Sequence, residues 1–201
     1  MSTHPKAKPR FHQLATLVAV LLLGTGCAIY PKIGPAAKPV ENDTLLGKWK
    51  ISQFDFKVRC RRLPSKTPEY RISDARFWAS LFGLGILERN LVFYQIRHQL
   101  WYETYAPPGS AEANSRPMDE TVDVGLVRFV GTDKFYLRPL SSTWVRDYAM
   151  SYPKVLPYKS VSKDSNDVII TASPERWYWF LENKVRYPES FGTPWVFYRV
   201  K

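Results

Sequence analysis

The sequence contains few of the residues that build metal sites and covalent crosslinks. Its 201 residues include two cysteines, Cys27 and Cys60, and three histidines, of which only His98 lies beyond residue 12. If Cys27 is modified, Cys60 has no partner, and a disulfide framework is excluded. A histidine-based metal site or a Ser-His-Asp arrangement would depend on His98 alone. We therefore expect no metal and no cofactor.

Catalytic signatures are also lacking. The chain has no glycine-rich phosphate loop and no pair of carboxylates that stands out from an ordinary polar surface. Cys60 lies between Arg59 and Arg61, and neighbouring cations would lower the pKa of its thiol and make it more reactive. The alternative is an unreactive, half-buried thiol. The absence of motifs favours a binding protein without catalytic residues over an enzyme.

No apolar run is long enough to cross a bilayer, which needs about 20 residues. The longest begins after Lys6, Lys8 and Arg10 and covers residues 14–23, and small residues then lead to Cys27. This order is typical of a secretory signal and resembles a bacterial lipoprotein signal, whose cysteine is acylated by chains such as palmitate. We expect a signal at residues 1–26 and lipid attachment at Cys27. An ordinary cleaved signal or a short membrane anchor is the alternative.

Acidic residues are outnumbered by basic ones, 18 to 29, so the formal net charge is +11. Such an excess favours an anionic membrane surface or an acidic ligand. Nucleic acid is the usual partner of a basic chain, but an exported protein rarely meets it, and we expect none. The expected location is the bacterial cell envelope, at the outer membrane.

Helical periodicity is not evident over several turns anywhere in the chain, whereas short alternating segments bounded by polar turns are frequent. Aromatic residues make up 15% of the sequence, and such side chains favour strands. The expected strands are 48–56, 91–105 (one strand or a hairpin with His98 in it), 122–130, 134–140, 158–162, 168–172, 177–182 and 195–200. This number of short strands predicts an all-β antiparallel barrel or sandwich.

Two segments interrupt this pattern. Residues 27–44 carry proline and lysine without periodicity and are expected to be a tether before a domain at 45–201. Residues 58–90 are expected to be a long insertion, basic at first and apolar at 77–87. The apolar part is too short to span a membrane. It could form a buried helix or lid, or it could contact a membrane surface.

Two blocks of sequence resemble the lipocalin family, in particular its bacterial outer-membrane lipoproteins. Pro39 and Val40 precede a Leu-Gly-Lys-Trp sequence at residues 46–49, as at the start of a lipocalin. Near the end, residues 168–172 and a Pro-Glu-Arg-Trp-Tyr-Trp-Phe-Leu sequence at 174–181 resemble the family's last hairpin and last barrel strand. The resemblance implies an eight-stranded up-and-down barrel with one open mouth and an apolar cavity.

The same resemblance implies roles for individual residues. In lipocalins the tryptophan of the first block closes the barrel floor, and an arginine at the end of the last strand packs across it. These positions correspond to Trp49 and Lys184. The implied register also directs Tyr94, Tyr178 and Phe180 into the cavity as ligand-binding residues.

The leading hypothesis is therefore a membrane-anchored protein that binds a small hydrophobic ligand, such as a fatty acid or a lysophospholipid. One alternative is a structural or assembly lipoprotein of the envelope with a filled core. Another is a barrel enzyme that uses Cys60 as its nucleophile or redox thiol.

Overall fold

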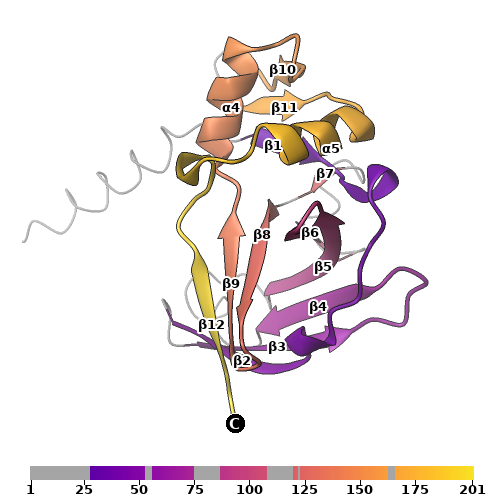
Figure 1. Cartoon of the computed structure of the whole chain (residues 1–201), viewed down its shortest axis with the longest axis vertical. Coiled ribbons are helices and arrows are strands. Elements are labelled where there is room, and N and C mark those ends of the chain that lie inside the picture. Colours follow the sequence, from indigo (N-terminus) through magenta and orange to yellow (C-terminus); the bar gives the residue numbers. More distant parts are fainter. Residues whose placement is uncertain (1–27, 53–55, 75–86, 108–119, 122, 163–165) are drawn as a thin grey trace, which may run out of the picture.

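Eight strands form a closed antiparallel barrel, and a smaller cap lies against it (Figure 1). The computed structural model describes residues 28–52, 56–74, 87–107, 120–121, 123–162 and 166–201. The barrel strands, in order around the wall, are β2 (Gly47–Ile51), β3 (Phe56–Arg62), β4 (Glu69–Asp74), β5 (Leu87–Ile96), β6 (Gln99–Tyr105), β8 (Asp123–Val130), β9 (Lys134–Pro139) and β12 (Trp195–Arg199). All neighbouring pairs are antiparallel. The predicted all-β, eight-stranded barrel is confirmed.

Alternation along the strands separates an apolar interior from the outer wall. In β2, for example, Trp49 and Ile51 are buried, whereas Lys48 and Lys50 are exposed. This period of two places every second side chain inside a pleated wall. The buried interior residues are Leu45, Trp49, Ile51, Val58, Cys60, Tyr70, Leu91, Phe93, Tyr102, Val127, Phe135, Leu137 and Phe197.

Tight turns connect the strands at one end of the barrel. Gly131 begins the turn between β8 and β9 with φ of 65°, a conformation that favours glycine. His98 lies exposed in the turn between β5 and β6, beside Arg97 with φ of 54°, and not within a strand as expected. The expected insertion at 58–90 is also wrong, because barrel strand β4 and most of β3 lie within residues 58–74. The apolar segment 77–87 lies outside the described residues, except that Leu87 begins β5.

The cap contains a second sheet and two helices. Its strands are β1 (Ala28–Pro31), β7 (Glu120–Thr121), β10 (Tyr158–Ser160) and β11 (Val168–Ile170), in the order β10-β11-β1-β7. The helices are α4 (Ser142–Ser151) and α5 (Pro174–Asn183). Short 3-10 turns occur at η1 (Gly34–Ala36), η2 (Asp43–Leu45) and η3 (Pro188–Ser190).

Residues 28–44 are part of this folded structure, which corrects the expected tether. Ala28 and Ile29 pair in parallel with Val168 and Ile169 of β11, and Tyr30 is 3% exposed. Further along, Pro39 bridges to Tyr94 of β5. The chain is thus held in place by the cap and by the barrel from residue 28 onward.

Helix α5 replaces the strand expected at 177–182. The Ser173 hydroxyl caps its N-terminus by accepting a hydrogen bond from the Arg176 amide, and Pro174 occupies a first-turn position that needs no amide donor. Trp177, Phe180 and Leu181 are buried at the spacing of one helical face. The Ser-Pro-Glu start was the local signal for this helix, and the dense aromatic residues masked it.

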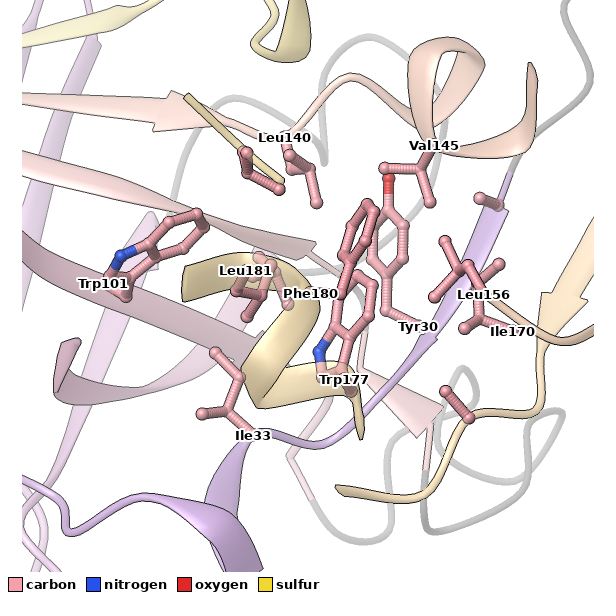
Figure 2. Packing of buried hydrophobic residues seen from close by; sticks show 14 of the residues in the cluster. Tyr30, Ile33, Trp101, Leu140, Val145, Leu156, Ile170, Trp177, Phe180 and Leu181 are labelled. Atoms are coloured by element: carbon pink, nitrogen blue, oxygen red, sulfur yellow. The ribbon is translucent and has the colours of Figure 1, made fainter. Parts of the chain in front are cut away.

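The cap covers the outer wall of β5, β6 and β8. The outward side chains Val92, Tyr94, Ile96, Trp101 and Val124 are buried against the cap's apolar residues. In this cap core the rings of Tyr30, Trp177 and Phe180 lie together (Figure 2). The ring of Trp177 stacks on Tyr30 at a centroid distance of 5.5 Å and on Phe180 at 5.3 Å. The described chain therefore has two apolar cores, one inside the barrel and one between barrel and cap.

A carboxyl group is buried at the edge of the cap core. Glu103 of β6 is 2% exposed, and its Oε2 accepts a hydrogen bond of 2.7 Å from the Ile33 amide. Burial raises the pKa of Glu103 to about 7, although this hydrogen bond and the charge of Lys32 act in the opposite direction. Ionisation of Glu103 therefore opposes folding.

We expect stability to fall as the pH rises from 4.5, the ordinary pKa of Glu103, to about 7, because the folded state holds this proton more tightly than the unfolded state. Glu103→Gln keeps an acceptor for Ile33 and removes the titration. It should be more stable than the parent by about 3 kcal/mol above pH 7 and equally stable near pH 4. Urea unfolding across this pH range measures both values. Glu189→Gln, at an exposed position, is the matched control. If the difference in unfolding free energy between Glu103→Gln and the parent is the same at all pH values, the raised pKa of Glu103 is contradicted.

Candidate functional site in the barrel interior

One end of the barrel is closed by Trp49 and by the segment before β2. Trp49 is fully buried, and its indole Nε1 donates a hydrogen bond of 2.8 Å to the Leu45 carbonyl of η2. Leu45 is also fully buried against the interior residues. The predicted position of Trp49 in the barrel floor agrees with this arrangement.

Arg199 completes this closure from the last barrel strand. Its guanidinium lies 4.3 Å from the Trp49 ring centroid. It donates hydrogen bonds to the carbonyls of Leu46 (2.9 Å), Thr44 (2.6 Å) and Thr132 (2.8 Å). A planar guanidinium suits this combination of stacking and multiple donation, which an ammonium group cannot reproduce. One side chain thus joins η2, the β8–β9 turn and β12.

Gly47 gives Arg199 the room that it needs. A Cβ at residue 47 would lie 3.0 Å from Arg199 Nη1, and the residue has φ of 128°, which L side chains rarely adopt. The Gly-Lys-Trp sequence therefore has a physical basis. Glycine admits the guanidinium, and the tryptophan two residues later accepts it on its ring face.

The closing segment is also fixed on the opposite side of the barrel. The Val40 amide donates to the Phe93 carbonyl of β5 (2.8 Å), and the Asn42 amide donates to the Tyr70 hydroxyl of β4 (2.7 Å). Burial is the main cause of a raised Tyr70 pKa. Arg62 at the end of β3 pairs with Glu41. Residues 40–46 consequently span the barrel end from β5 to β12.

The interior is aromatic along β9 and β12 and more aliphatic along β3 to β5. Phe135 stacks on Phe197 at 4.4 Å and meets the edge of Trp49 at 4.6 Å between centroids. Val58, Cys60, Ile72 and Leu91 face inward on the other strands, as the strand register requires. Tyr70 and Phe93 add aromatic rings to that side.

Polar residues lie at the far end of the interior. Thr104 pairs with inward-facing Leu91, and its buried hydroxyl has no hydrogen-bond partner among the described residues. Arg89 is partly buried and pairs with Ile72, which places it on the inner face. These two residues lie near the strand ends that lead to residues 75–86 and 108–119. An amphiphile inside the barrel would meet them with its polar end.

None of the three residues predicted to bind ligand lies in the barrel interior. Phe93 faces inward and Tyr94 outward, because Phe93 pairs with inward Tyr102 and Tyr94 with outward Trp101. Tyr94 is 3% exposed in the cap core. Tyr178 and Phe180 belong to helix α5 and also pack in the cap core. For Tyr94 the predicted alternation was right in period but wrong in the choice of face, whereas Tyr178 and Phe180 lie on a helix and not on the predicted strand.

Lys184 does not contact Trp49. It caps the C-terminus of α5, with its Nζ 5.3 Å from the Trp179 ring. The error follows from taking 177–182 as the last barrel strand, because the real last strand is β12 and carries Arg199. The arginine at the end of an alternating C-terminal segment was the signal that sequence reasoning missed.

The Cys60 thiol is buried in the barrel interior and is 3% exposed. Arg59 and Arg61 point to the outer face, so they do not activate it. Burial instead raises the pKa of Cys60 to about 12. Of the two alternatives for Cys60, the structure therefore favours the unreactive thiol, since the thiolate is the nucleophile.

Within the described ranges, no cluster of three or more His, Cys, Asp or Glu side chains could hold a metal ion, and no helix is long and apolar enough to cross a membrane. Cys27 lies outside the described residues. In comparisons with known proteins, no family model, curated protein or solved structure matches this chain. The assignment of a function consequently depends on the geometry of the site itself.

Replacement of Arg199 by lysine tests the closed end. Arg199→Lys keeps the charge but loses most of the donors, and should lower the free energy of unfolding by about 2–3 kcal/mol, as expected for hydrogen bonds to a charged group. Lys184→Ala removes a surface cation and should change it by less than about 0.5 kcal/mol. Chemical denaturation measures both. Equal effects of the two substitutions would refute the role of Arg199.

Proposed function

We propose that this protein is a lipid-anchored, lipocalin-like protein of the bacterial envelope whose barrel interior binds a small hydrophobic ligand. The observation that carries the proposal is an interior lined by apolar and aromatic side chains and closed at one end by Trp49 and Arg199. A fatty acid or a lysophospholipid has matching chemistry. Its acyl chain would contact the interior, and its head would lie near Thr104 and Arg89.

The size of the barrel supports this proposal. Eight strands enclose an interior just wide enough to be filled by side chains or to hold one small ligand. Binding of an acyl chain there would gain about 0.8 kcal/mol for each buried methylene group. The aliphatic side of the interior, formed by Val58, Ile72 and Leu91, is the part of the wall that we assign to such a chain.

The lipocalin resemblance is strengthened at one point by the corrected last strand. The family pairs its Gly-x-Trp tryptophan with an arginine of the last strand, and Arg199 holds this relation to Trp49. Lys184 was a departure from the pattern, whereas Arg199 follows it. The resemblance supports a barrel with a closed floor, and ligand binding remains part of the proposal.

The anchor follows from the sequence of the first 27 residues. Strand β1 begins at Ala28, directly after Cys27, and is buried in the cap. An acyl group on Cys27 would therefore hold the cap close to the bilayer without a long spacer. This arrangement would place the barrel where hydrophobic molecules are concentrated.

Aromatic packing near the closed end supports the alternative function, an envelope protein with a filled core. Trp49, Phe129, Phe135 and Phe197 form a continuous aromatic cluster near the closed end, with centroid distances of 4.4 to 5.7 Å. Such packing resembles an ordinary protein interior. Measurement of ligand binding separates the two functions.

Protein purified from membranes should carry bound lipid in native mass spectrometry, and the delipidated protein should take up a fluorescent fatty acid. Leu91→Trp fills the aliphatic side of the interior and should weaken uptake at least about tenfold, about 1.4 kcal/mol of binding free energy, because the larger ring occupies the space assigned to the acyl chain. Val130→Trp adds the same ring on the exposed outer face of β8 and should leave uptake unchanged. If the folded parent binds neither lipid nor probe, the filled-core alternative holds.

Metabolic labelling with a palmitate analogue tests the anchor. The parent should be labelled, and Cys27→Ser should not be, because acylation requires this thiol. Cys60→Ser should keep the label, since Cys60 is buried in the barrel. Label that persists in Cys27→Ser, or that never appears in the parent, would contradict lipid attachment at this residue.

A further inference from the structure

The outer face of β2 and β3 carries cations in direct register. Lys48 lies opposite Arg59, and Lys50 lies opposite Lys57. Arg61 follows on the same face of β3, two residues after Arg59. All five side chains are exposed. Opposed like charges on neighbouring strands are destabilising, so this arrangement has a cost in free energy that a binding function would explain.

Four of these cations, Lys48, Lys57, Arg59 and Arg61, are not neutralised within the described part of the chain. No described carboxylate forms an ion pair with Lys48, Lys57, Arg59 or Arg61. Two acidic side chains at this end of the barrel pair with other cations, Glu41 with Arg62 and Asp133 with Arg199. The positive potential of the face is thus available to an external partner.

The outer face stays free of carboxylates on β12, which pairs with β2, and on β9, which pairs with β12. The outward positions of β2, β3, β9 and β12 contain no carboxylate. On β9 and β12, Lys134 lies 5.0 Å from the ring centroid of Tyr136 and 5.1 Å from that of Tyr198. We call this surface the basic wall, and its outward residues are Lys48, Lys50, Lys57, Arg59, Arg61, Lys134, Tyr136 and Tyr198.

The cap leaves the basic wall uncovered. It packs on outward apolar residues of β5, β6 and β8, whereas β2, β3 and β12 lie on other sides of the barrel (Figure 1). Tyr198 is 42% exposed on this wall. Lysine stems and tyrosine rings present apolar bodies with polar tips, a combination that suits the headgroup layer of a membrane.

We propose that the basic wall binds the surface of a bilayer that contains anionic phospholipid. The partner is argued from charge complementarity and from the mixture of lysine with tyrosine. Lysine supplies point charges without fixed orientation, which suits a fluid array of headgroups. This inference rests on the proposed export to the envelope, but not on acylation of Cys27 or on a ligand in the barrel.

The test uses the full chain with Cys27→Ser, so that no acyl chain contributes. It should co-sediment with vesicles of phosphatidylcholine and phosphatidylglycerol, and more weakly with phosphatidylcholine alone. Replacement of Lys48, Lys57, Arg59 and Arg61 together by glutamine should weaken binding to the anionic vesicles at least about tenfold, because each basic residue near such a surface contributes to partitioning. Added salt should weaken the parent's binding in the same direction.

A matched control removes four exposed cations elsewhere, with Lys38→Gln, Lys154→Gln, Lys159→Gln and Arg186→Gln together. It should bind within about twofold of the parent, since it leaves the basic wall intact. A second variant, Lys48→Arg with Lys57→Arg, keeps the charge and should bind like the parent. Circular dichroism verifies folding of each variant. Equal losses in the wall and control variants would overturn the proposal, as would binding to heparin without binding to anionic vesicles.

Discussion

The guanidinium of Arg199 is the contact on which closure of the barrel depends. It stacks on Trp49 and donates to three carbonyls in two chain segments, the segment before β2 and the β8–β9 turn. Its position is possible because Gly47 lacks a side chain and adopts a positive φ. Through residues 40–46 the same closure reaches Tyr70 and Phe93 on the opposite strands. The first and last strands of the barrel are thereby fixed by one polar cluster, and the apolar interior is sealed beneath it.

The outer wall of the barrel divides into two surfaces with different chemistry. On β5, β6 and β8 the outward residues Val92, Tyr94, Ile96, Trp101 and Val124 are apolar and are covered by the cap, which includes the first described strand of the chain. On β2, β3, β9 and β12 most of the outward residues are basic or tyrosine, and those of the basic wall are not packed under the cap core. The cap therefore both stabilises the barrel and determines which wall can meet a partner. If Cys27 is acylated, the anchor attaches directly to this cap, without a spacer.

Local signals predicted most barrel strands, because a period of two and a Gly131 turn involve only neighbouring residues. They failed where a choice depended on distant partners. Phe93 and Tyr94 are both aromatic and both fit a buried position, and only the pairing of β5 with β6 and the position of the cap decide which faces inward. Similarly, an aromatic segment at 177–182 fits a strand or a helix, and burial of Trp177 and Phe180 against Tyr30 selects the helix.

The sequence by itself determined the antiparallel all-β class and the basic excess of the chain, because these depend on composition and on the local period of two, whereas the closed eight-stranded barrel and the closing role of Trp49 were implied by the lipocalin resemblance. The tertiary structure decided that Arg199 contacts Trp49, that Cys60 is buried and unreactive, and that residues 28–44 are folded rather than a tether. It also gathered the cations into one wall. These features depend on contacts between residues far apart in the chain, and such contacts form only when strand register and the position of the cap are set.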